Sequence, residues 1–328
     1  MLGWFATFAL LGAIGTWMAR RYALAHSLVD QPGERRSHAV PTPRGGGVAI
    51  VAVVLVAVAI GAARSVVAMD LALAFGIGML AIAAVGLVDD HRPLSPWLRL
   101  AVHALAAVGV AIAWSLEGGS LAMAVVIFAG CVGLTNAWNF MDGINGIAAT
   151  QAALVALVIV FTVGIQGWGM VALALAAACL GFLPFNFPNA RIFLGDVGSG
   201  AIGFAIAALA VLALGDEPRT FWLLVPMLLS AFVLDAGLTL LRRVIRGERW
   251  WTPHTQHAYQ SCARKWGHAR VTISYCVWTA ASALISLRAA VLAPQLMWIV
   301  IGAWYTAGAL LWLMLQRATH GHMRMDPV

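Results

Sequence analysis

The sequence predicts an all-α integral membrane protein, a single bundle of about eleven transmembrane helices over residues 1–328. The chain is 62% hydrophobic and only 10% charged. Its mean hydropathy of +0.89 exceeds what the core of one soluble domain of this length can bury. Apolar runs of about 20 residues, the length that a helix needs to cross a bilayer, recur along it. Because no internal repeat or low-complexity linker divides the chain, one domain is expected.

The predicted spans are apolar runs that end at charge, proline or glycine, since irregular backbone is costly inside lipid. In chain order they are 2–18, 47–63, 71–88, 100–116, 121–136, 147–164, 169–185, 200–215, 222–241, 272–292 and 296–315. The first three spans are separated by segments that contain MARR and PRGGG and then by ARSVVAMD. The third to the seventh spans are followed, in order, by VDDHRP, EGGS, NAWNFMDGING, IQGWG and NFPNAR. DEPRT follows the eighth span, LRRVIRGER follows the ninth, and APQ precedes the last. The first run has no basic region before it and no A-x-A site after it, so we expect a retained span.

Lysine and arginine indicate the orientation, because basic residues in short loops are retained on the cytoplasmic side. Of the 20 basic residues, 17 fall in alternate segments that share one side when the N-terminus is outside. These segments are 20–46, 89–99, 136–146, 186–199, 242–271 and the C-terminal tail. We therefore expect an outside N-terminus and a cytoplasmic C-terminus. The net charge of +7 then belongs to one membrane face, and no nucleic-acid partner is needed to explain it.

Four carboxylates fall on that same face. Asp89 and Asp90 end the third span, Asp142 follows the fifth and Asp196 precedes the eighth. Carboxylates that converge near a membrane edge repel one another unless a cation compensates them. Mg²⁺ fits because it prefers oxygen ligands and is usually held by one or two carboxylates plus phosphates, and Mn²⁺ is a substitute. For Asp89 and Asp90 a solvated helix end is the alternative.

The stretch NAWNFMDGINGIA separates two apolar runs with polar residues at a spacing of three. Asn136, Asn139 and Asp142 share one side of a continued helix and can reach one ligand. Gly143 and Gly146 allow a tight turn or a close approach of the backbone to a phosphate. The alternative is an ordinary polar turn.

Two further stretches suggest phosphate contacts. In FLGDVGSG, Gly195, Gly198 and Ser199 are expected to expose backbone N–H groups at the start of a helix, where anions bind. In PHTQHAYQ, His254 and His257 have no cysteine partner, so phosphate contact is favoured over zinc. The arginines and the lysine around this second stretch are typical of attraction to anionic lipid.

Five motifs occur in a fixed order between about residues 29 and 260: PTPRGGG, VDD, NxxNFMDGxNG, FLGDVGS and the late histidine loop. In these the chain resembles the polyprenyl-phosphate N-acetylhexosamine-1-phosphate transferases. That family includes the lipid I synthase and the enzymes that initiate O-antigen, enterobacterial common antigen and teichoic acid linkage units. The resemblance implies Mg²⁺-dependent transfer of a sugar-1-phosphate from a UDP-sugar to undecaprenyl phosphate, with release of UMP, at the cytoplasmic face of a bacterial inner membrane.

The resemblance also implies roles for residues at matching positions. The expected catalytic residues are Asp89, Asp90, Asp142 and His257, and the expected metal ligands are Asp196 and Asp90. The expected substrate contacts are Arg44, Asn136, Asn139, Asp142, Gly195, Ser199, His254 and His257. The chain departs from the family at Asn145, where many members have aspartate. Its histidine loop is also sparser than that of the lipid I synthases, which favours initiation of a surface polysaccharide such as O-antigen.

The chief alternative function is a secondary transporter. Transporters bind substrate near the bilayer midplane in broken helices, whereas the acidic residues here gather at one end. Asp235, inside the ninth span, is the feature that best suits a transporter, and pairing with Arg242 or Arg243 is the other explanation for it. A homodimer is compatible with the sequence. For the transferase, direct attack by the lipid phosphate is favoured, and an aspartyl-phosphate intermediate stays open.

Overall fold

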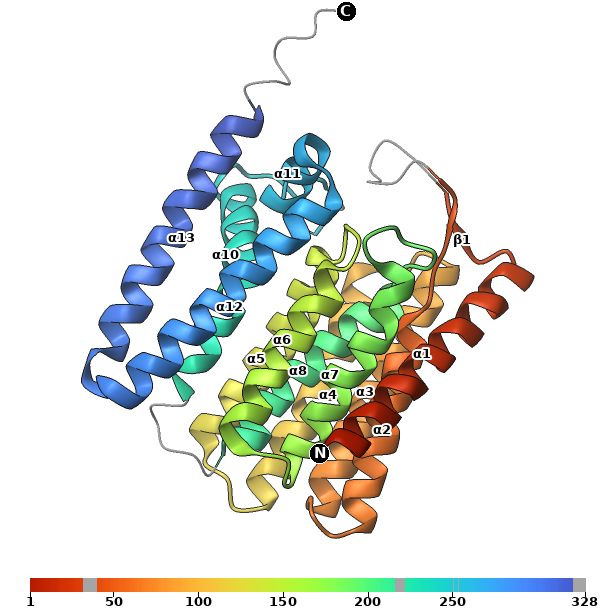
Figure 1. The fold of residues 1–328 in the computed structure, drawn as a ribbon, viewed down its shortest axis with the longest axis vertical. Coiled ribbons are helices and arrows are strands. Elements are labelled where there is room, and N and C mark those ends of the chain that lie inside the picture. Colours follow the sequence, from red (N-terminus) through yellow and green to blue (C-terminus); the bar gives the residue numbers. More distant parts are fainter. Residues whose placement is uncertain (32–39, 216–221, 250, 253, 321–328) are drawn as a thin grey trace, which may run out of the picture.

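The protein is almost entirely helical in the computed structural model, which describes residues 1–31, 40–215, 222–249, 251–252 and 254–320. These residues hold twelve α-helices, one 3₁₀ turn and one short strand pair (Figure 1). The helices are α1 (Leu2–Ala25), α2 (Gly47–Ala63), α3 (Met69–His91), α4 (Pro96–Leu116), α5 (Leu121–Met141), α6 (Ile147–Val163), α7 (Trp168–Asn186), α8 (Asp196–Leu214), α10 (Leu224–Ile245), α11 (Ala258–Trp266), α12 (His268–Leu292) and α13 (Met297–His320), with η1 at Pro294–Leu296. The all-α prediction is confirmed.

Each of the eleven predicted spans coincides with one of these helices. Nine are long and apolar enough to cross a membrane among the residues described, and α2 and α6 are shorter apolar helices of 17 residues. Large apolar side chains such as Leu105, Phe161 and Trp298 are exposed on the outer surface, as lipid-facing residues would be. The chain is a multi-pass membrane protein. The number of crossings and the orientation stay predictions, and Arg219 and the tail 321–328 lie outside the described part.

Helix α8 forms the centre of the larger helix group. It is almost wholly buried and packs against α2, α3, α5, α6 and α7. Small residues permit this, as is usual between membrane helices. A Cβ added to Gly47 of α2 would lie only 2.2 Å from the Cα of Gly198 in α8. This close packing fixes where α8 begins, and therefore where Asp196 lies.

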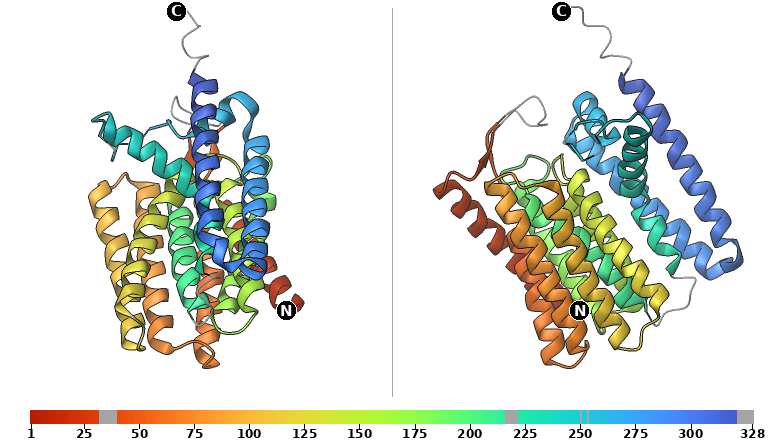
Figure 2. Two further views of the ribbon diagram at one scale, coloured as in Figure 1. Left: turned by 90° about the vertical axis from the view of Figure 1, so that its left-hand side faces the viewer. Right: turned by 180° about the vertical axis from the view of Figure 1, so that it is seen from behind.

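Helices α10, α12 and α13 form a second group beside the first, as Figures 1 and 2 show from three sides. Trp278 of α12 and Trp304 of α13 both donate hydrogen bonds to Oγ of Ser230 in α10, each at 2.9 Å. The short helix α11 lies at the end of this group that bears the loops of the predicted cytoplasmic face. It falls within segment 242–271, for which the sequence predicted a loop.

The strands β1 (Val29–Asp30) and β2 (Thr42–Pro43) are the one β element in the described residues. They pair antiparallel, with Asp30 opposite Thr42. The predicted segment 20–46 therefore contains a small hairpin whose ends are described and whose residues 32–39 lie outside the described part. The hairpin brings Asp30 and Arg44 to the same end of the bundle as the carboxylates.

Candidate functional site

The predicted carboxylates converge where α3 ends and α8 begins. Asp89 and Asp90 occupy the last turn of α3, and Asp196 is the first residue of α8. The two helices approach closely at Gly86, where an added Cβ would lie 2.4 Å from the carbonyl oxygen of Asp196. A residue with a side chain at this position would keep the carboxylates apart.

Asp90 caps helix α8. Its side chain is 3% exposed. Its two carboxylate oxygens accept hydrogen bonds from the backbone N–H groups of Asp196 (3.2 Å) and Val197 (3.3 Å). A carboxylate at a helix N-terminus satisfies free N–H groups and complements the helix dipole. The interaction fixes the start of α8 against the end of α3.

This capping corrects one prediction about FLGDVGSG. The N–H groups of Gly198 and Ser199 both donate to the carbonyl oxygen of Gly195 at 3.0 Å. Those of Asp196 and Val197 donate to the carboxylate of Asp90. The expectation that this loop presents open N–H groups to an anion is therefore wrong for Gly198 and Ser199, and it stays a prediction for Gly195. Ser199 is fully buried and accepts a hydrogen bond from Asn139 (3.1 Å), so it orients that residue. Gly195, with φ of 78°, forms the turn that precedes the helix.

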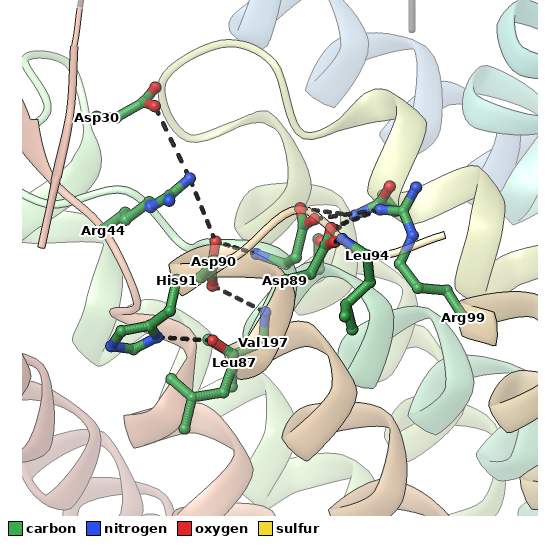
Figure 3. A network of polar contacts seen from close by, with 12 residues as sticks. Asp30, Arg44, Leu87, Asp89, Asp90, His91, Leu94, Arg99 and Val197 are labelled. Atoms are coloured by element: carbon green, nitrogen blue, oxygen red, sulfur yellow. Dashed lines mark hydrogen bonds and ion pairs between the residues drawn. The ribbon is translucent and has the colours of Figure 1, made fainter. Parts of the chain in front are cut away.

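Two arginines compensate the carboxylates, which the sequence analysis did not anticipate. Figure 3 shows Arg44 between Asp30 and Asp90, and Arg99 beside Asp89. Nη1 of Arg44 lies 3.9 Å from Asp30 and 3.8 Å from Asp90. Nη1 of Arg99 lies 2.7 Å from Asp89 and 3.4 Å from Asp196.

Arg99 and Asp30 are thus site residues that the sequence reasoning missed. A signal for Arg99 was present, because Pro96 marks a helix start just after the paired aspartates and Arg99 follows on its first turn. Asp30 had no such signal, since only strand pairing brings it near Asp90. The sequence analysis considered a metal cation for these carboxylates, whereas two arginines of the protein already contact them.

The carboxylates of Asp89 and Asp196 lie close together, since Nη1 of Arg99 contacts both. Two carboxylates in this position require a shared proton or a cation. Asp196 retains access to the cavity described below, whereas both oxygens of Asp90 are taken by α8 and Arg44. Of these three carboxylates Asp196 is the one that lines the cavity, whereas Asp89 and Asp90 are each engaged by an arginine and by backbone N–H groups.

The end of α5 supplies the amide side chains. Nδ2 of Asn139 donates to Asp196 at 2.9 Å. Asn136 donates to the carbonyl oxygen of Val132 in its own helix and also contacts His103 of α4, a buried residue that the sequence analysis did not single out. Asp142 is the residue on which α5 ends. Burial, reinforced by the charge of Asp90, raises the pKa of Asp142 to about 7.

The glycine-rich turn after α5 is held by side-chain amides. Gly146 has φ of 79°, and its N–H donates to Oδ1 of Asn186 at 2.7 Å, while Nδ2 of Asn186 donates to the carbonyl oxygen of Ile192. Asn145 donates to Pro188 and accepts from Thr272. Asn145 therefore joins loops and α12, which agrees with the absence of a catalytic carboxylate at this position.

The two predicted histidines lie together, with ring centroids 4.9 Å apart. Burial, followed by the charges of His257 and Arg243, lowers the pKa of His254 to about 4, so this ring is neutral near pH 7. The side chain of Arg243 is buried and contacts Glu248 at 3.1 Å, Thr252 and a backbone carbonyl. It holds the loop in place, which corrects the interpretation that it attracts lipid.

Asp235 pairs with neither Arg242 nor Arg243, so that explanation of the residue is wrong. Arg242 donates to Gln316 of α13. The carboxylate of Asp235 instead accepts hydrogen bonds from α11, α12 and α13.

One cavity of about 720 Å³ unites most of the predicted residues. Its polar wall contains Arg99, Asn136, Asn139, Asp142, Asp196, His254 and His257. Its apolar wall comes from α3, α4, α5 and α10, with Val85, Leu134 and Val233 among its residues. Asp89, Asp90, Arg44, Gly195 and Ser199 do not line it. A charged end continuous with an apolar trough is suited to a ligand that has a charged head and an apolar chain.

The fold and this site define a multi-pass membrane protein with a charged cluster and a cavity at one end of its helical bundle. Residues 71–214 match the profile of Glycosyl transferase family 4. The decaprenyl-phosphate N-acetylglucosaminephosphotransferase of Mycobacterium tuberculosis is 31% identical, over 83% of this chain and 78% of that relative. The chain belongs to this family, among the polyprenyl-phosphate N-acetylhexosamine-1-phosphate transferases, which confirms the resemblance seen in its motifs.

Two other relatives indicate the breadth of the similarity. The undecaprenyl-phosphate alpha-N-acetylglucosaminyl 1-phosphate transferase of Thermotoga maritima is 27% identical, over 77% of this chain and 80% of its own length. The phospho-N-acetylmuramoyl-pentapeptide-transferase of Moorella thermoacetica is 33% identical but aligns with only 49% of this chain and 58% of its own length.

Proposed function

We propose that this protein transfers N-acetylhexosamine-1-phosphate, or a deoxy variant of it, from a UDP-sugar to undecaprenyl phosphate. UMP is released, and the product starts a lipid-linked surface polysaccharide of the O-antigen type. The observation that carries the proposal is the single cavity in which Asp196, Asn139 and Arg99 meet an apolar wall on one side and the histidine loop on the other. The names of the relatives, which act on polyprenyl phosphates, support the same reaction class.

The cavity suggests how two unlike substrates meet. The apolar trough between α4, α5 and α10 suits the first isoprene units of the lipid, with its phosphate near Arg99. The opposite wall, with Asp142 and the histidine loop, suits the sugar nucleotide, whose pyrophosphate needs donors such as His257 and Asn139. Both phosphates then lie next to Asp196.

We further propose Mg²⁺, or Mn²⁺ in its place, at Asp196, with Asp90 or Asp89 as the neighbouring carboxylate. No group of three or more His, Cys, Asp or Glu side chains in the described ranges is arranged to hold a metal by itself. Asp196 at the cavity wall fits Mg²⁺ nonetheless, because this ion is commonly held by one or two carboxylates together with water and substrate phosphates. Bound there, the ion would neutralise charge that develops on the pyrophosphate.

The residues of the chain then position the reactants. A phosphate monoester has a second pKa of about 6, so the lipid phosphate is largely ionised at neutral pH and needs no strong base. Its oxygen forms a bond to the β-phosphorus of the UDP-sugar, and the bond from that phosphorus to the bridging oxygen breaks, leaving the electron pair on UMP. Arg99 holds the carboxylates and the incoming phosphate in one place, and Asn139 orients Asp196. Most of the catalysis is positioning and electrostatics, as is usual in phosphoryl transfer.

The proposed site faces the cytoplasm of a bacterial inner membrane, in accord with the distribution of basic residues. A transporter is not favoured by any feature of the described structure. Asp235, the residue that best suited a transporter, is enclosed by protein donors and is absent from the cavity wall.

The test uses purified protein, Mg²⁺, undecaprenyl phosphate and a panel of UDP-N-acetylhexosamines, with UMP release as the readout. We expect UMP with at least one sugar, and Asp196→Asn should lower turnover by about 10²-fold or more, as expected for loss of one preorganised electrostatic contact. Asp70→Asn, at the opposite end of α3, is the matched control and should be nearly silent. Folded protein that releases no UMP with any sugar would overturn the proposal.

A further inference from the structure

Asp235 is an ionisable residue within an apolar helix, where carboxylates are costly and usually functional. It lies midway along α10, and its side chain is 2% exposed. Oδ2 accepts hydrogen bonds from the backbone N–H of Tyr259 (2.9 Å) and the hydroxyl of Tyr275 (2.8 Å). Oδ1 accepts from the N–H of Ala258 (2.8 Å) and Nε1–H of Trp312 (3.1 Å). One carboxylate thus joins α10 to α11, α12 and α13.

The first two of these donors are the opening N–H groups of α11. Ala258 and Tyr259 are the first and second residues of that helix, and His257 is the residue before it. A helix N-terminus leaves such N–H groups unpaired, and a buried carboxylate is a strong partner for them. Asp235 therefore determines where α11 begins, and with it the backbone position of His257.

The side chain of His257 is held by the same carboxylate. Its Nδ1 lies 3.8 Å from Oδ1 of Asp235, an ion-pair distance, and has no hydrogen-bond partner among the described residues. Nδ1 therefore faces the carboxylate, and Nε2, on the opposite side of the ring, is left for the cavity that His257 lines. The ring stacks between Phe140 (centroid distance 6.3 Å) and Tyr259 (5.8 Å).

The contact continues to the nucleotide side of the proposed site. The hydroxyl of Tyr259 donates to the carbonyl oxygen of Phe140 at 2.9 Å, two residues before Asp142. The same hydroxyl packs against Gly143, where an added Cβ would lie 2.2 Å away. The start of α11 and the end of α5 are therefore one connected unit, and Asp235 anchors it.

We infer that Asp235 is a positioning residue for the transferase: it fixes α11 and the His257 ring so that Nε2 of His257 meets the pyrophosphate of the sugar nucleotide. The identity of the reaction rests on the function proposed above. The anchoring itself rests on the contacts of Asp235 alone. The alternative is that Asp235 only holds α10, α12 and α13 together.

Ser230 separates these two roles because it is a matched control on the same helix. It also joins α10 to α12 and α13, through Trp278 and Trp304, and it makes no hydrogen bond to α11 among the described residues. Asp235→Asn places an amide N–H among N–H donors and should lower kcat/KM for the UDP-sugar by about 10²-fold, the loss expected when a reacting group shifts by roughly 1 Å. Ser230→Ala should stay within about twofold of the parent, because no hydrogen bond to α11 is lost.

A double-mutant cycle with His257→Ala provides the decisive comparison. Because Asp235 is argued to act through His257, the double variant should lose no more activity than the more damaging single variant. Losses that multiply would overturn the inference, as would a Ser230→Ala loss equal to that of Asp235→Asn. If Asp235→Asn fails to fold, Tyr275→Phe replaces it, because this change removes one hydrogen-bond donor and keeps the carboxylate. The double variant of Tyr275→Phe with His257→Ala should again lose no more activity than the more damaging single variant.

A second readout does not depend on transferase activity. Hydrogen–deuterium exchange should show the amides of Ala258 and Tyr259 protected in the parent protein and exchanging at least about tenfold faster in Asp235→Asn, with no change in Ser230→Ala. Unchanged exchange would refute the anchoring. A parent protein that shows this protection but releases no UMP would refute the proposed reaction and leave the anchoring intact, so the two failures are distinguishable.

Discussion

Replacement of Gly86 by alanine tests whether the contact between α3 and α8 sets the geometry of the site. The new Cβ would lie 2.4 Å from the carbonyl oxygen of Asp196, 2.5 Å from its carbonyl carbon and 2.6 Å from the nitrogen of Val197. All three are backbone atoms, so no side chain can rotate away. To reach an ordinary contact distance of 3.4 Å, the start of α8 must retreat by about 1 Å.

That retreat would break the cap that Asp90 forms on α8. Its hydrogen bonds to the N–H groups of Asp196 and Val197 are already 3.2 and 3.3 Å long, and a further shift of about 1 Å takes them beyond hydrogen-bonding range. Overpacking of this kind costs about 1–3 kcal/mol of stability. Displacement of Asp196 by about 1 Å should lower kcat/KM by about 10²-fold.

The assay is UMP release, measured alongside thermal unfolding in the same detergent. Gly76→Ala is the control on the same helix, because its Cβ would have only Leu55 within 4 Å, at 3.8 Å. It should be fully active and no less stable. A Gly86→Ala protein with the turnover and melting temperature of the parent would refute the packing argument. A lowered melting temperature with unchanged turnover would refute the link between this contact and catalysis.

Three other predictions follow from the same structure. Gly143→Ala should impair activity because its Cβ would lie 2.2 Å from the Tyr259 hydroxyl oxygen. Adding Tyr259→Phe removes that oxygen and should partly restore activity. A double variant no more active than Gly143→Ala would contradict this prediction. The pKa of Asp142 is raised from about 4 to about 7, so between these two pH values the folded protein binds more protons than the unfolded chain. The folded protein therefore loses stability as the pH rises from about 4 to about 7. Asp142→Asn should therefore gain in melting temperature relative to the parent from about pH 5 to about pH 7 and then level off, whereas a constant difference would contradict the shift. In a cysteine-free background, Ser95→Cys should be shielded from an impermeant thiol reagent in intact cells and Glu117→Cys should react; the reverse pattern would invert the predicted topology.

Composition and the length of the apolar runs were enough to predict every α-helix of the described part except the short α11. A segment of about 20 apolar residues has few alternatives to a helix in lipid, since every backbone polar group must be paired within the segment. The predicted bounds of 47–63 match α2 as observed. Errors arose where helices extend past their apolar core, as at α3, which continues to His91 and carries the paired aspartates on its last turn.

The sequence also placed the site residues at one end of the bundle, because consecutive membrane helices run in opposite directions and alternate loops therefore lie on the same face. It singled out Asp89, Asp196, Asn139 and His257 from residue type and motif order. Their mutual distances were not predictable, since those depend on how closely α3, α5 and α8 pack. The small residues that permit this packing, such as Gly86, show their importance only when the neighbouring helix is known.

Only the tertiary structure decided which groups pair with which. Arg99 lies between Asp89 and Asp196 because α4 packs against α3, which in turn packs against α8, and Asp30 reaches Arg44 and Asp90 through the strand pair. Asp235, placed in a span by the sequence, turned out to bind the start of α11, 23 residues further along. A sequence reports the type of each ionisable group and its depth along a helix. Its partner is set by which helices are neighbours and how each is rotated, because hydrogen bonds and ion pairs act only over a few ångströms.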